Sequence, residues 1–152
     1  MAMSADHINT FLLAATKILK DMCQMETTVQ KPCMRDSALT DDSVVIKIGL
    51  TGQLQGNVMV DLPRMLACEI ASKMCMMPIT ELNEISKSAL SELGNMIFGN
   101  AATLFSTKGI AMDITPPSLL EGSEAFAGGN KNLCVPVTYD KHTMGFNFAV
   151  ME

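Results

Sequence analysis

The apolar residues near the start of the chain recur with the spacing of one helical face, which predicts an amphipathic helix. Ser4 precedes this stripe and is the expected N-cap. The stripe consists of Ile8, Phe11, Leu12, Ala15, Ile18, Leu19 and Met22. A weak strand is expected at 27–34, on the edge of a sheet because Pro32 interrupts it.

Apolar and polar residues then alternate, which predicts strands with one apolar face each. The first two are marked by Val44, Ile46, Ile48 and Leu50, and by Leu54, Gly56, Val58 and Val60. The short turn near Gly52 predicts that they form a hairpin. Alternation at 110–114, 133–139 and 144–150 predicts three further strands, and 121–132 reads as a glycine-rich loop.

Two more helices are expected between these strands. One should open at Asp61 and Pro63 and run to about residue 77. The other, much longer, should start at Thr80 and end at Lys108 and Gly109. The resulting order α-β-β-β-α-α-β-β-β predicts an α+β fold, with an antiparallel sheet packed against long helices, in a single domain spanning 1–152.

The long helix has two different faces when its residues are placed at about 100° each. One arc is apolar and should face the sheet: Leu90, Leu93, Ile97, Ala101 and Leu104. The opposite arc holds Ser88, Glu92, Asn95 and Gly99, flanked by Ile85, Met96 and Phe98. A solvated face would favour stronger helix formers, whereas small residues let another surface approach closely. The pattern alone leaves both interpretations open.

Composition and charge exclude several classes of protein. With 48% apolar and 18% charged residues, the 152-residue chain should be a compact globule. A net charge of −5 without a basic cluster argues against nucleic acid as a partner. The chain shows neither a membrane-spanning apolar run nor a signal peptide, so we expect a cytoplasmic protein with no membrane partner and five reduced cysteines.

Glu92 and Asn95 are the candidate chemical groups, because residues three apart lie side by side on a helix. A carboxamide both donates and accepts hydrogen bonds, so it can hold a water for attack on phosphorus, as amides do in GTPases. The run Met74-Cys75-Met76-Met77 could be a soft copper site. Because the chain has 14 methionines, packing at a helix end is the favoured interpretation, and no metal site is predicted.

Ser88, Glu92 and Asn95 resemble the helix motif of the CheC/CheX/FliY family of chemotaxis phosphatases. The segment DITPP at 113–117 is similar to the proline-bearing strand that follows this helix in the family, and GLTGQLQGNVMV at 49–60 resembles its hairpin. CheC and FliY carry the helix motif twice. This chain carries it once, so the resemblance is closest to CheX.

The resemblance implies a phosphatase that hydrolyses the aspartyl phosphate of a CheY-like response regulator. Asn95 would orient the attacking water, and Glu92 would pair with a lysine of the regulator. The docking surface would include Ser88, Gly99, Met96, Phe98 and Pro117. The regulator would supply Mg²⁺, so the chain needs no cofactor of its own, and a homodimer is expected. The alternative is a non-catalytic binding module that docks a response regulator or a motor component through the same helix.

Overall fold

The computed structural model describes residues 3–35, 42–122 and 132–152. These residues form three helices, α1 (Ala5–Cys23), α2 (Arg64–Cys75) and α3 (Glu84–Thr107). They also form eight strands: β1 (Thr28–Val29), β2 (Cys33–Arg35), β3 (Ser43–Gly52), β4 (Gln55–Pro63), β5 (Met112–Ile114), β6 (Ser118–Glu121), β7 (Asn132–Tyr139) and β8 (His142–Met151). None of the described helices is both long and apolar enough to cross a membrane.

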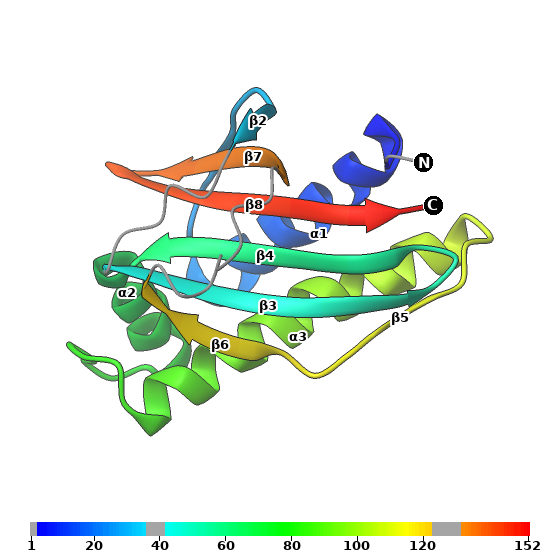
Figure 1. Cartoon of the computed structure of the whole chain (residues 1–152). Helices are drawn as coiled ribbons and strands as arrows, with labels where there is room; N and C mark the ends of the chain where they lie inside the picture. The colour runs from blue at the N-terminus through cyan, green and yellow to red at the C-terminus, as the bar shows by residue number, and fades with distance from the viewer. Residues whose placement is uncertain (1–2, 36–41, 123–131) are drawn as a thin grey trace.

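All the strands join one antiparallel sheet in the order β1-β7-β8-β4-β3-β5, with β2 also pairing β7 and β6 also pairing β3. Figure 1 shows the long helix α3 running along the sheet beneath β3 and β4, with α1 and α2 beside it. The predicted α+β fold, with an antiparallel sheet packed against long helices, is therefore confirmed.

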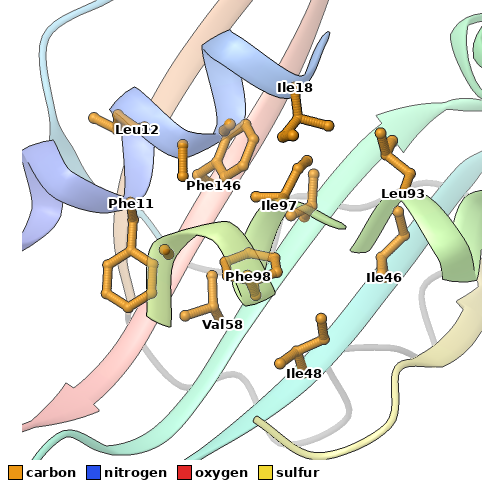
Figure 2. Packing of buried hydrophobic residues seen from close by; sticks show 14 of the residues in the cluster. Phe11, Leu12, Ile18, Ile46, Ile48, Val58, Leu93, Ile97, Phe98 and Phe146 are labelled. Carbon is orange, nitrogen blue, oxygen red and sulfur yellow. The ribbon is translucent and has the colours of Figure 1, made fainter. Parts of the chain in front are cut away.

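The main apolar core lies between the helices and the inner face of the sheet (Figure 2). Its aromatic centre is Phe11 of α1, whose ring centroid lies 5.9 Å from that of Phe98 and 5.0 Å from that of Phe105, both on α3. The sheet contributes side chains such as Ile46, Val58 and Phe146, which are almost completely buried. This core fixes one face of α3 and leaves the other available.

The first helix follows its pattern closely. Ser4 caps α1 by accepting a hydrogen bond from the backbone N–H of His7, as expected. The stripe from Ile8 to Leu19 is buried, but Met22 is 40% exposed, so its assignment to the apolar stripe was wrong. The helix ends at the buried Cys23, and its C-cap Gln24 takes the left-handed conformation.

The predicted hairpin is confirmed, with Ile46 opposite Val60 and Ile48 opposite Val58. Its second strand is longer than expected. Asp61 does not open a helix but continues β4 opposite Gly145 of β8, because the neighbouring strands extend the ladder that far. Pro63 is consequently the N-cap of α2 rather than a residue of its first turn.

The two sheet edges carry short strands that sequence periodicity resolves poorly. The weak strand expected at 27–34 is two strands, β1 and β2, and both lie on the edge beside β7. At the other edge, β5 and β6 pair with successive parts of β3, and Pro116 and Pro117 separate them. The strand β6 was not predicted, because four residues directly after two prolines give no readable alternation.

The long helix starts later than predicted. Thr80 lies outside it, and Asn83 is the N-cap. The Asn83 side chain accepts a hydrogen bond from the backbone N–H of Ser86, while the Ser86 hydroxyl accepts one from the backbone N–H of Asn83. This reciprocal capping box satisfies two donors that the helix itself cannot, which decides where it begins. At the other end, Lys108 and Gly109 terminate α3 as predicted.

Candidate functional site

The two faces of α3 differ as the sequence predicts. Leu90, Leu93, Ile97 and Ala101 are buried against the core, and Leu104 is partly buried. Ser88, Glu92 and Asn95 are exposed on the opposite face. The outward position of this stripe follows from the helical period, because the buried residues fix the rotation of the helix about its axis.

The side-chain polar groups of Glu92 and Asn95 are available to a partner, as far as the described part of the chain shows. Neither the Glu92 carboxylate nor the Asn95 carboxamide makes a side-chain hydrogen bond or ion pair there. Since the two residues are three apart on a helix, their β-carbons lie about 5–6 Å from each other. The amide and the carboxylate can therefore both contact one partner molecule.

The two glycines of α3 serve different purposes. A β-carbon on Gly94 would lie 2.9 Å from Cγ2 of Ile46, so the glycine lets α3 approach the sheet closely. A β-carbon on Gly99 would meet no atom of the described residues within 4 Å, apart from its chain neighbours and the nearby helix backbone. Packing inside the chain thus explains Gly94, for which the sequence pattern offered no account, but does not explain Gly99.

Phe98 and Met96, the two predicted docking residues that flank the polar stripe, differ in how deeply they are buried. Phe98 was expected on the docking surface, but it is completely buried and its ring packs against that of Phe11. It is a core residue, because its position on the helix turns toward α1 and the sheet. Met96 is half-buried at the border of the core, so part of its side chain is accessible beside Asn95.

Pro117 lies close to α3, although it is distant from the helix motif in sequence. Its Cβ would be 3.7 Å from a β-carbon on Gly94, the residue before Asn95. The segment is held by Thr115, whose backbone N–H donates to the Gly49 carbonyl at 2.9 Å and whose hydroxyl accepts from the Gly49 N–H at 2.9 Å. The break between β5 and β6 thus brings Pro117 against α3 at Gly94, the residue that precedes Asn95.

A group of charged side chains that the sequence did not point to positions the start of α3. Glu121 of β6 accepts hydrogen bonds from Lys87 of α3 and Arg64 of α2, both at 3.2 Å. The hydrogen bond from Lys87, with a second from Arg64, lowers the pKa of the Glu121 carboxyl. One carboxylate therefore joins two helices and the sheet near Ser88, and no local pattern could have revealed a contact between such separate segments.

A shallow groove adjoins the exposed stripe at the N-terminal end of α3. Its lining residues come from α2 and α3 and include two of the candidate residues: Cys75, Glu84, Ile85, Ser88, Ala89 and Glu92. Large apolar side chains are exposed nearby, with Ile85 on α3 and Met76 and Met77 just after α2. Apolar surface gathered beside polar groups is typical of protein–protein contact sites.

The described residues include no cluster of side chains that could hold a metal ion. No group of three or more His, Cys, Asp and Glu side chains in residues 3–35, 42–122 and 132–152 could hold a metal ion. Met74 packs against the core while Met76 is 92% exposed, so the methionine run does not converge on a soft metal site. The carboxamide and the carboxylate of the candidate site are of the chemical kind that can position a water or a partner group.

Comparison with known proteins supports the resemblance. The sequence model of the family "Chemotaxis phosphatase CheX" matches residues 44–138. A Thermotoga maritima protein named "CheY-P phosphatase CheX" is 29% identical over 123 residues, which are 80% of this chain and 79% of the relative.

Solved structures agree with this match. The CheX-CheY-BeF3-Mg+2 complex from Borrelia burgdorferi contains a chain 28% identical to this one, with a TM-score of 0.82 over 98% of this chain and all of the other. CheX from Vibrio vulnificus has the same fold, with a TM-score of 0.82 and 24% identity over 97% of this chain and all of the other. This chain belongs to the CheX family of chemotaxis phosphatases.

Proposed function

We propose that this protein is an aspartyl-phosphate phosphatase that acts on a phosphorylated CheY-like response regulator. The observation that carries the proposal is the exposed, uncommitted carboxamide of Asn95, one turn from the Glu92 carboxylate on a helix fixed from behind by the core. The name of the Thermotoga relative and the regulator in the Borrelia complex support the choice of substrate.

In the proposed reaction, Asn95 orients a water molecule in line with the labile phosphorus–oxygen bond. The water oxygen attacks phosphorus, the bond to the regulator's aspartyl oxygen breaks, and inorganic phosphate and a free carboxylate are released. The carboxamide suits this task, because its carbonyl accepts a hydrogen bond from the water while its NH₂ donates to an acceptor nearby. The contribution is positional, and orienting a reactant well is worth several orders of magnitude in rate.

Docking would use the rest of the exposed stripe. Glu92 would pair with a lysine of the regulator, and Ser88, Gly99, Met96 and Pro117 would lie against its surface. The open space at Gly99 supports this, because a close approach there needs a residue without a side chain. The exposed Met76, Met77 and Ile85 would extend the contact along the groove beside Ser88 and Glu92.

The regulator would contribute both the phosphorylated aspartate and the Mg²⁺ beside it. Mg²⁺ prefers several oxygen ligands, and the described residues of this chain offer no such cluster near Asn95. Mg²⁺ neutralises negative charge on the phosphoryl group during the transfer. This chain's part is to bind the regulator, exclude bulk water and hold the one water that reacts.

The test is phosphate release from a phosphorylated response regulator, measured with and without this protein. Asn95→Ala should lower the acceleration by about 10²-fold or more while leaving binding to a regulator carrying a stable phosphoryl mimic nearly unchanged. Ser106→Ala is the matched control, because Ser106 is exposed on the same helix beyond the stripe. Equal phosphate release by wild type and Asn95→Ala would disprove the role of Asn95.

The second candidate function is a non-catalytic module that binds a regulator or a motor component through the same helix. The accessible groove and its exposed apolar residues would serve such a role equally well. The same assay separates the two functions. Tight binding of the phosphorylated regulator without any acceleration of phosphate release would favour the binding module.

We also propose that the protein forms a homodimer and folds as a single domain, as the resemblance implies. The exposed edge of β1, where Val29 is 42% exposed, is one place at which a second sheet could join. Sedimentation velocity would report a species of twice the chain's 16.4 kDa if the dimer forms and a species of 16.4 kDa if it does not.

A further inference from the structure

Two cysteines lie directly opposite each other on neighbouring strands. Cys33 of β2 is the register partner of Cys134 of β7 in an antiparallel pair. Residues directly opposite in such a pair have Cα atoms about 4.5–5.5 Å apart and point to the same face of the sheet. Both cysteines are present as thiols.

This separation suits a disulfide bond. Disulfides join Cα atoms about 4.4–6.8 Å apart and β-carbons about 3.5–4.5 Å apart, and these ranges meet those of directly opposite residues in an antiparallel pair, so only a small shift of the two strands is needed. The strand β2 has three residues and, among the described strands, pairs only with β7. A short strand held on one side can make such a shift without disturbing the rest of the sheet.

The accessibility of the two thiols assigns them different roles. Of the five cysteines, Cys33 is exposed, Cys75 is partly exposed and the others are buried. Cys134 has no exposed surface. An oxidant in solution therefore reaches Cys33 first, and Cys134 is the neighbour that can react with the product.

The remaining cysteines are poor competitors. Burial raises the pKa of the Cys23 thiol to about 11 and also raises the pKa of Cys68, and neither is the register partner of Cys33 as the buried Cys134 is. Cys75 lies on α2 beside Ile79 and Ala89, far along the chain from either member of the pair and without another cysteine in its cluster.

We propose that Cys33 and Cys134 form a reversible disulfide when the protein meets a peroxide. The Cys33 thiolate attacks one peroxide oxygen, the O–O bond breaks, and Cys33 becomes a sulfenic acid as hydroxide leaves. The Cys134 sulfur then attacks the Cys33 sulfur, the S–O bond breaks, and water leaves with the Cys134 proton. In total, two thiols are oxidised and one hydrogen peroxide is reduced to two waters.

The pair lies on the face of the sheet opposite the helices. Cys134 is the register partner of Asn147 on β8, and Asn147 is the register partner of Met59 on β4. Their neighbours along the strands, Val135, Phe146 and Val60, point into the helical core instead. The oxidised thiols would therefore lie away from the exposed stripe of α3, and oxidation should change stability rather than activity.

The experiment treats the folded wild-type protein with hydrogen peroxide, blocks the remaining thiols by alkylation and maps the peptides by mass spectrometry. Before alkylation, the disulfide-linked monomer should be lighter than the reduced protein by about 2 Da, and the mapped peptides of Cys33 and Cys134 should be linked, with the link lost on reduction. The melting temperature of the linked monomer should exceed that of the reduced protein, because the bond closes a loop of roughly 100 residues.

Three variants complete the test. Cys33→Ser should form no intramolecular disulfide, and Cys134→Ala should leave Cys33 as a sulfenic acid that a dimedone probe traps. Cys75→Ser is the matched control and should be oxidised as the wild type is. Linkage of other cysteines, or the absence of any intramolecular link in folded wild type and Cys75→Ser, would overturn the proposal. Because the wild type carries the main result, the test remains decisive even where a variant fails to fold.

Discussion

Gly94 of α3 and Ile46 of β3 approach so closely that a β-carbon on the glycine would lie 2.9 Å from Cγ2 of the isoleucine. Ile46 is 1% exposed, and its Cγ2 is a branch methyl rather than the free end of a flexible chain. The contact therefore fixes how near the helix lies to the sheet. It also explains a glycine inside a helix, where that residue type normally costs stability.

Gly94→Ala should destabilise the protein. The added methyl overpacks a filled core, at a cost of about 1–3 kcal/mol, which outweighs the roughly 1 kcal/mol that alanine returns in helix propensity at most positions. Urea unfolding of the purified variant would measure the change as a lower midpoint. A midpoint at or above that of the wild type would contradict the tight contact.

Gly99→Ala should have the opposite effect on stability. Apart from its chain neighbours and the nearby helix backbone, no atom of the described residues lies within 4 Å of the added methyl, so the variant gains helix propensity of roughly 0.5–1 kcal/mol without a clash. On the proposed docking surface, however, the methyl stands between the two proteins and should weaken regulator binding. Urea unfolding and a regulator titration measure the two effects, and unchanged binding would remove Gly99 from the docking surface.

Glu92→Gln should weaken association with the regulator while leaving the fold intact. The exposed carboxylate makes no side-chain ion pair in the described part of the chain, so unfolding should change by less than about 0.5 kcal/mol. Loss of one partner of an intermolecular charge pair costs about 2–5 kcal/mol when the pair is buried. Isothermal titration with the regulator measures this.

Glu26→Gln is the control for that experiment. It makes the same change of charge at a residue whose side chain is 80% exposed and pairs only with Lys20 in the described structure. Equal weakening by both substitutions would mean that overall charge, rather than a contact of Glu92, governs association.

Glu121→Gln should change the dependence of stability on pH. The hydrogen bond from Lys87, with that from Arg64, holds the pKa of Glu121 below its ordinary value of 4.5. The stabilisation is therefore present above the pKa of the unfolded chain and is lost as the pH falls through the lower pKa of the folded protein. Because the side chain is 41% exposed, we expect less than about 1 kcal/mol.

Thermal unfolding between about pH 3 and pH 7 would test this expectation, with the two limits chosen to lie on either side of the carboxyl range. The variant should be less stable than the wild type at neutral pH, and the difference should shrink toward the acid limit. A constant difference across the range would mean that Glu121 acts through packing and not through its charge.

The fold was largely predictable because its signals are local. Periodicity gave α1, the β3–β4 hairpin and both faces of α3, since the residues that face the core repeat with the period of their element. The start of α3 was predicted at Thr80, because threonine is common at helix starts. The helix instead begins after Asn83, where the side chains of Asn83 and Ser86 form a capping box. The short β6 was missed because its structure comes from pairing with β3 rather than from its own sequence.

The candidate site was predicted only in part, because only some of its contacts are between residues close together in the sequence. Ser88, Glu92 and Asn95 share a helix face and could be read from spacing. Phe98 was wrongly predicted to lie on the docking surface, because it stands at the border between the two faces of α3. Whether such a residue is buried depends on what packs against it, and here that is Phe11 of α1. The contacts of Glu121 with Lys87 and Arg64 join three separate segments, and such contacts exist only after the chain has folded.

The division of α3 into a buried face and an unpartnered outer face has a consequence for how this protein can evolve. Substitutions at positions 88, 92, 95 and 99 remove no contact with the buried core of the described residues, so on the proposed docking surface selection can alter the choice of regulator with only small changes in stability. A gene duplicate could acquire a new signalling partner through a few changes along one line of the helix. The scaffold would not need to be rebuilt.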